Sequence, residues 1–139
     1  MNFKIVNKFI KEINFKIPSV KTFIQLENKI SDYNIKIDIK SSQVKDKILE
    51  VDTSLSLVPM NKLEDKIETN ITYAAIIEFT GELPNKEELE KIILIKIPSE
   101  LYTDLRKIFL NIFESSGFKG IKIGETVDFE KLYQQRKVQ

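Results

Sequence analysis

The 139-residue sequence contains no cysteine and no histidine. These absences exclude disulfide bonds, thiolate and imidazole metal ligands, cysteine nucleophiles and the imidazole general base. The glycines at positions 117, 120 and 124 fit neither the phosphate-loop pattern nor the dinucleotide-binding pattern. We therefore expect no enzyme, no catalytic residue, no metal and no cofactor, and the function has to come from surfaces that bind.

The chain also lacks an excess of charge of either sign, since 22 Lys and Arg stand against 21 Asp and Glu. The opposite charges are interspersed, so nucleic acid is not an expected partner. No run approaches the roughly 18 apolar residues of a membrane span. Residues 1–15 lack the apolar core and cleavage site of a signal peptide. We expect a single domain over residues 1–139, without membrane insertion and in the cytoplasm.

Alternating apolar and polar residues predict four β-strands in the first 80 residues. The odd-numbered positions from Phe3 to Ile17 predict one buried face on a long first strand, which ends at Pro18 because proline has no N–H to donate. Residues 18–33 show neither periodicity and predict an irregular crossover, which is a candidate site. The further strands are predicted over residues 34–40, 49–57 and 66–80, with a turn at residues 41–46.

The second half of the chain has helical periodicity, which is strongest over residues 98–118. Ser99 is the predicted N-cap of this helix and Gly117 its closing residue. Its apolar stripe is Leu101, Leu105, Ile108, Phe109, Ile112 and Phe113. Shorter helices are predicted after Asn85 and after Asp128. Strands followed by helices predict an α+β fold with an antiparallel sheet.

Three parts of the chain, taken together, match the pattern of a known family. FKIVNKFIKEINFKIP over residues 3–18 is similar to a first strand of that family, and YNIKIDIKSSQV over residues 33–44 is similar to its second strand and following turn. The helical part matches at Leu101-Tyr102 with Arg106, at Gly117-Phe118 and at VDFEKLYQQR over residues 127–136. Together these segments cover nearly the whole chain, in order, and resemble the protein-export chaperone SecB.

The resemblance implies a SecB-like four-stranded antiparallel sheet with a crossover between strands one and two, helices packed on one face, and a homotetramer built as a dimer of dimers. It also implies an ATP-independent holdase that binds unfolded precursor proteins in apolar grooves and keeps them competent for export. The implied client-binding residues are Phe23, Ile24, Leu26, Ile35, Ile37 and Ile39. Ile71 and Tyr73 are implied oligomer contacts, and Glu12 is an implied contact with the translocation ATPase SecA.

The chain departs from the family pattern on the surface that would dock SecA. Lys16 and Asn70 stand where the family carries acidic residues, and no Cys/His zinc segment is present. Two alternatives to an export chaperone stay open. One is a solitary SecB-like chaperone that holds the antitoxin of a toxin–antitoxin system, and a neighbouring toxin–antitoxin gene pair would favour it. The other is an apolar small-ligand carrier, which co-purified lipid in a monomer would favour.

Overall fold

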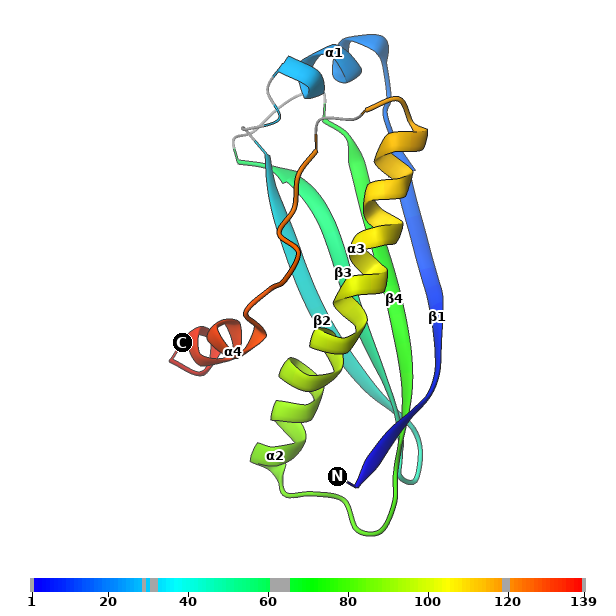
Figure 1. Ribbon diagram of the computed structural model, residues 1–139, viewed down its shortest axis with the longest axis vertical. Coiled ribbons are helices and arrows are strands. Elements are labelled where there is room, and N and C mark those ends of the chain that lie inside the picture. Colours follow the sequence, from blue (N-terminus) through cyan, green and yellow to red (C-terminus); the bar gives the residue numbers. More distant parts are fainter. Residues whose placement is uncertain (1, 29, 31–32, 61–65, 119–120, 139) are drawn as a thin grey trace.

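The computed structural model describes residues 2–28, 30, 33–60, 66–118 and 121–138, with a sheet crossed on one face by a long helix (Figure 1). The strands are β1 (Phe3–Lys16), β2 (Tyr33–Lys45), β3 (Ile48–Pro59) and β4 (Glu68–Phe79). The helices are α1 (Val20–Asn28), α2 (Lys86–Lys91), the π-helix η2 (Ile92–Lys96), α3 (Ile97–Ser115) and α4 (Phe129–Val138). The strands pair antiparallel in the order β1-β4-β3-β2. The predicted α+β fold is confirmed.

Strand β1 carries two β-bulges that change which of its side chains face α3. Its pairing with β4 slips by one residue at Val6 and again at Lys11, and each bulge moves the following side chains to the opposite face. Between the bulges, Phe9 pairs with Ala74 and lies on the open face of the sheet, which is the face that α3 does not cover. The prediction of one continuous buried face is therefore wrong for this part of β1. The bulges also explain why the polar Asn7 and Lys11 fall among the odd-numbered positions.

Two segments contain more regular structure than their periodicity predicts. The prediction of an irregular crossover at residues 18–33 is wrong, because this segment contains α1, where the N–H of Thr22 donates to Ser19 Oγ at 3.1 Å. A helix of nine residues makes only about two and a half turns, too few for a clear period. Strand β2 continues through most of the turn predicted at residues 41–46, and the chain reverses around Lys47, whose φ is 66°.

Helices α2, η2 and α3 form one continuous helical path from Lys86 to Ser115. Asn85 caps its start as predicted, because its side-chain oxygen accepts the N–H of Glu88 at 2.8 Å. The prediction that Ser99 is the N-cap of the long helix is wrong. Its hydroxyl donates to the carbonyl of Ile95 in the preceding turn at 2.5 Å. The long helix thus begins before Ser99, because the preceding turns are helical as well.

The apolar stripe of α3 forms the core against the sheet. Its fully buried members are Leu101, Leu105, Phe109 and Phe113. The ring of Phe113 meets the ring of Phe15 in β1 edge-to-face, with 5.0 Å between centroids. Each such side chain stabilises the fold by about 1.5–3 kcal/mol when it leaves water. The stripe predicted from the sequence is therefore confirmed as the core face.

The end of α3 at Gly117 is also confirmed, and it has the geometry of a Schellman motif. Gly117 has a φ of 100°, and its N–H donates to the carbonyl of Glu114 at 3.0 Å. The N–H of Phe118 donates to the carbonyl of Phe113 at 3.0 Å. The rings of these two phenylalanines pack with 6.2 Å between centroids, so the turn also completes the core.

Gly117→Ala is expected to lower the free energy of unfolding by about 1–2 kcal/mol, as measured by urea denaturation. The new Cβ would lie 3.8 Å from the ring of Phe23, which is ordinary contact. The cost therefore comes from the positive φ alone. Ser115→Ala, an exposed change at the same helix end, should stay within about 0.5 kcal/mol of the wild type. Equal losses in the two variants would contradict the prediction.

Candidate functional site

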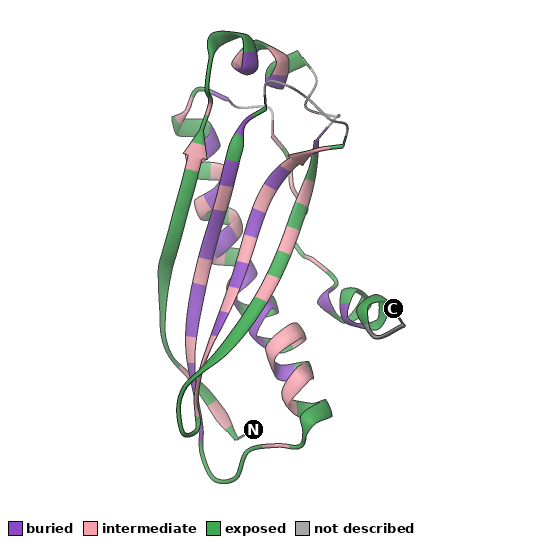
Figure 2. Ribbon diagram, turned by 180° about the vertical axis from the view of Figure 1, so that it is seen from behind, coloured by how far each residue is buried: buried purple, intermediate pink, exposed green. Residues whose placement is uncertain are grey.

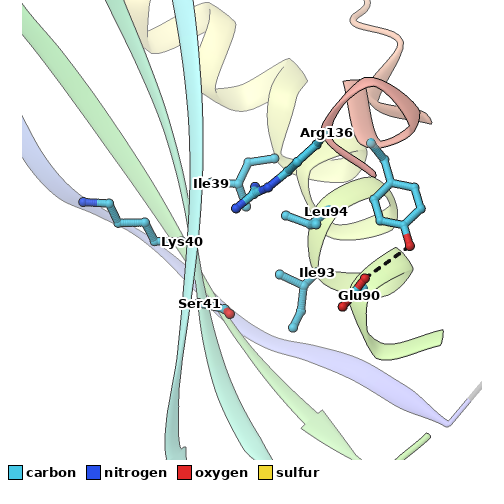
Figure 3. A pocket seen from close by; sticks show the side chains of 8 residues that line it. Ile39, Lys40, Ser41, Glu90, Ile93, Leu94 and Arg136 are labelled. Atoms are coloured by element: carbon cyan, nitrogen blue, oxygen red, sulfur yellow. Dashed lines mark hydrogen bonds between the residues drawn. The ribbon is translucent and has the colours of Figure 1, made fainter. Parts of the chain in front are cut away.

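A groove runs along the edge strand β2, between that strand and the helices η2 and α4 (Figure 3). It consists of two adjoining cavities of about 590 and 200 Å³. Both cavities are lined by Ile39, Leu94, Tyr133 and Arg136. In Figure 3, Ile39 points from β2 towards the helices and Leu94 points back towards the strand. The groove therefore has apolar walls on both sides.

Two polar groups at the groove, those of Tyr133 and Glu90, are hydrogen-bonded to each other. The hydroxyl of Tyr133 donates to Glu90 Oε2 at 3.3 Å. Burial, followed by the negative charge of Glu90, raises the pKa of Tyr133, so the phenol keeps its proton. Within the described residues, no cluster of acidic side chains is suited to hold a metal ion. The arrangement suits binding of an apolar partner.

Three of the client-binding residues expected from the family resemblance lie on β2. Ile37 lines the smaller cavity and Ile39 lines both. Ile35 has the same orientation further along the strand, and all three are half-buried against the core. Tertiary structure thus brings two of these expected residues into one groove. The alternation of β2 predicted that these isoleucines share a face, and their role as a client-binding wall was implied by the resemblance to SecB.

The other three expected client-binding residues lie on α1, at one end of the sheet (Figure 1). Ile24 is 51% exposed and Phe23 is half-buried, so both reach the surface. Leu26 is fully buried in the core. Leu26 therefore anchors α1 to the core, and of these three residues only Phe23 and Ile24 are accessible to a partner.

The opposite wall of the groove was not anticipated from the sequence. It consists of Ile93 and Leu94 from η2 together with Leu132, Tyr133 and Arg136 from α4. The pattern of the last helix gave one usable signal, because Leu132 and Tyr133 share a side with Phe129. The direction in which that side points depends on tertiary packing.

The two residues expected at the oligomer interface lie on the helix-facing side of β4. Ile71 is fully buried and Tyr73 is half-buried. Four large apolar side chains on the edge strand β1 are exposed instead, and this strand is exposed along most of its length (Figure 2). These residues are Val6, Phe9, Ile10 and Ile13, which are 40–54% exposed.

Glu12 lies on the open face of the sheet and is already bonded there. Its Oε1 accepts the side-chain N–H of Asn70 at 2.9 Å, and the amide oxygen of Asn70 accepts the hydroxyl of Ser56 at 3.0 Å. Asn70 of β4 therefore links β1 and β3 through its hydrogen bonds to Glu12 and Ser56. A partner that binds Glu12 has to compete with this network.

Beside Glu12, Lys11 binds two carboxylates of β3. Its ammonium donates to Glu50 and, at 3.0 Å, to Asp52. Hydrogen bonds from Asp52 and from Lys11 lower the pKa of Glu50, whereas burial raises the pKa of Asp52. The acidic groups here are thus partly neutralised by the chain itself, and the open face does not present a strongly acidic surface.

The family pattern described as "Preprotein translocase subunit SecB" matches residues 1–139. The chain belongs to the SecB family. A similar protein is the "Putative protein-export protein SecB" of Pelagibacter ubique (strain HTCC1062), which is 41% identical over 135 residues. The match covers 97% of this chain and 96% of that protein. The "Protein-export protein SecB" of Granulibacter bethesdensis is 22% identical over 97% of this chain and 82% of its own length.

A solved structure supports the fold of this SecB-family chain. It is the Mycobacterium tuberculosis Rv1957 SecB-like chaperone in complex with a ChAD peptide from the Rv1956 HigA1 antitoxin. The TM-score is 0.66 at 13% identity, over 88% of this chain and 90% of the other. The predicted SecB-like fold is therefore confirmed. Family membership and the names of the relatives also confirm the predicted function as a protein-export chaperone.

Proposed function

We propose that this SecB-family chain is an ATP-independent holdase that binds unfolded, export-bound polypeptides in the groove beside β2. The main observation that supports this proposal is that half-buried Ile37 and Ile39 face Leu94 across an open space of several hundred Å³. An extended client can bury apolar side chains between these walls. Binding of the unfolded state keeps a client unfolded by mass action, so no catalytic group is required.

Phe23 and Ile24 of α1 are proposed as a second client contact. They present apolar surface at the end of the sheet. Ile35 is proposed to link this surface to the groove, since it has the same orientation as Ile37 on β2. An unfolded chain that touches both places would gain affinity because the second contact becomes intramolecular.

A homotetramer, a dimer of dimers in the cytoplasm, is the proposed assembly. It is supported by the exposed apolar side chains of β1, which is an edge strand with unpaired backbone groups along one side. Ile10 pairs with Tyr73 and Ile13 pairs with Ile71 in the sheet register. The two expected interface residues would therefore act by supporting the exposed side chains of β1. If SecA docks at Glu12, it has to displace the hydrogen bond from Asn70.

A second candidate function is holding an antitoxin. It is favoured by one observation, namely that the SecB-like chaperone from Mycobacterium tuberculosis was solved with an antitoxin peptide. Both functions would use the same kind of groove, so the client distinguishes them. A toxin–antitoxin gene pair next to the gene for this chain would favour the second candidate.

The test of the proposed function is solution mass by light scattering on a sizing column, with and without a chemically unfolded client. We expect a mass of about four times the 16.2 kDa protomer and a stable complex with the unfolded client. The same client in its folded form is the control and should elute separately. A monomer that binds neither form would contradict the proposal, and a monomer with co-purified lipid would favour a ligand carrier.

A further inference from the structure

We propose that Arg136 makes the groove prefer unfolded segments that carry an acidic side chain close to their apolar residues. The inference rests on the proposed client-binding function and adds a charge preference to it. Apolar walls alone would accept any apolar segment. A charged group inside the groove would discriminate between the residues that flank the apolar ones.

Arg136 is an exposed residue of α4 that borders the groove. It extends from α4 across the groove towards Ile39, and its side chain lines both cavities (Figure 3). Among the described residues, the guanidinium of Arg136 has no hydrogen-bond acceptor and no ion-pair partner. Its donors are therefore available to a bound segment.

The other arginine of the chain shows what a structural arginine does here. Only two of the 22 basic residues are arginines. Arg106 of α3 donates from Nε and Nη2 to the carbonyl of Ile123, at 3.4 and 3.3 Å, and so fixes the segment that leads to α4. Arg136 has no such function within the described residues.

The remaining charged residues at the groove do not oppose Arg136. Glu90 lines only the larger cavity and accepts a hydrogen bond from Tyr133. The side chain of Lys40 extends away from the groove on the other side of β2 (Figure 3). Asp38 borders the smaller cavity, but it alternates with Ile37 and Ile39 and pairs with Ser54, so its side chain lies on the open face of the sheet. Of the two charged residues that border the smaller cavity, Arg136 is therefore the one whose side chain is directed into it.

The chemistry of the guanidinium specifies the partner. Its planar array of N–H donors matches a carboxylate, which it can bind through two parallel hydrogen bonds. In an extended segment, side chains two residues apart point the same way and lie about 6–7 Å from each other. The preferred client segment should therefore carry Asp or Glu two positions from the apolar residue that contacts Ile39.

The test uses three fluorescent 12-residue peptides that share their apolar positions and carry Glu, Gln or Lys two residues from a central Phe. Fluorescence anisotropy measures the Kd of each peptide for the full-length protein. We expect the Glu peptide to bind about 2- to 5-fold more tightly than the Gln peptide, and the Lys peptide to bind weakest. Arg136→Gln should remove this order, and Arg136→Glu should reverse it.

Two controls separate charge preference from groove binding. Lys131→Glu changes the net charge of the same helix by the same amount, but Lys131 does not line either cavity, so the order should persist. Leu132→Ser removes part of the apolar wall and should weaken all three peptides alike. An unchanged order of the three peptide affinities in Arg136→Glu would overturn this inference. It would not contradict client binding in the groove. Failure of the wild type to bind any peptide would overturn the proposed function as well.

Discussion

The double variant Ile37→Ser, Ile39→Ser is expected to lose at least about tenfold in affinity for unfolded clients, and with it the ability to suppress client aggregation. Both side chains line the groove. Each loses about 1 kcal/mol or more of apolar contact when it becomes a small polar group. Anisotropy with a labelled unfolded client measures the affinity, and light scattering of a slow-folding client measures the suppression.

The matched control is Val44→Ser. Val44 lies on the same strand and is 54% exposed, but it does not line the groove. Its replacement should leave both measurements unchanged. Because Ile37 and Ile39 also contact the core, Leu132→Ser provides a second test from the opposite wall, where the side chain is 41% exposed. If folded double and Leu132 variants retain full aggregation suppression, the groove is not the client site.

Phe113→Ala is expected to lower the free energy of unfolding by about 3–5 kcal/mol. Phe113 is fully buried and lies between three other rings, those of Phe15, Phe109 and Phe118, with centroids 4.9–6.2 Å away. The loss combines the transfer of a large apolar group with the cavity it leaves. It is a large share of the roughly 5–15 kcal/mol that stabilises a typical domain.

Urea denaturation followed by circular dichroism, at one fixed protein concentration, measures this loss. Phe113→Leu fills most of the cavity and should cost clearly less, about 1–2 kcal/mol. Leu83→Ala changes a side chain that is 44% exposed in the loop before α2, and it should stay within about 0.5 kcal/mol of the wild type. A loss below about 1 kcal/mol in Phe113→Ala would show that the ring is not part of a close-packed core.

Local sequence patterns were sufficient wherever one element buries one face. The stripe of α3, its end at Gly117 and the cap at Asn85 all depend on residues within a few positions of each other. The alternation of β2 predicted that Ile37 and Ile39 share a face. Such features follow from the 3.6-residue and 2-residue periods of helices and strands, so they can be inferred without knowledge of the fold.

Strand β1 shows where local patterns fail. Its side chains change face at Val6 and Lys11, where the pairing with β4 slips by one residue. A slip is a property of two strands that are about 60 residues apart in the chain, and the period of one strand does not reveal it. The same holds for Ser99, whose hydroxyl bonds the preceding helical turn.

The amino-acid sequence by itself determined the absence of cysteine and histidine chemistry, the four strands, the long apolar helix and the resemblance to SecB. Only the tertiary structure decided that β2 faces η2 and α4 across a groove and that Arg136 enters it. The physical reason is that periodicity specifies which side of each element is apolar. How much of that apolar surface stays uncovered depends on the packing of elements distant in sequence, such as Ile39 against Leu94 and Tyr133.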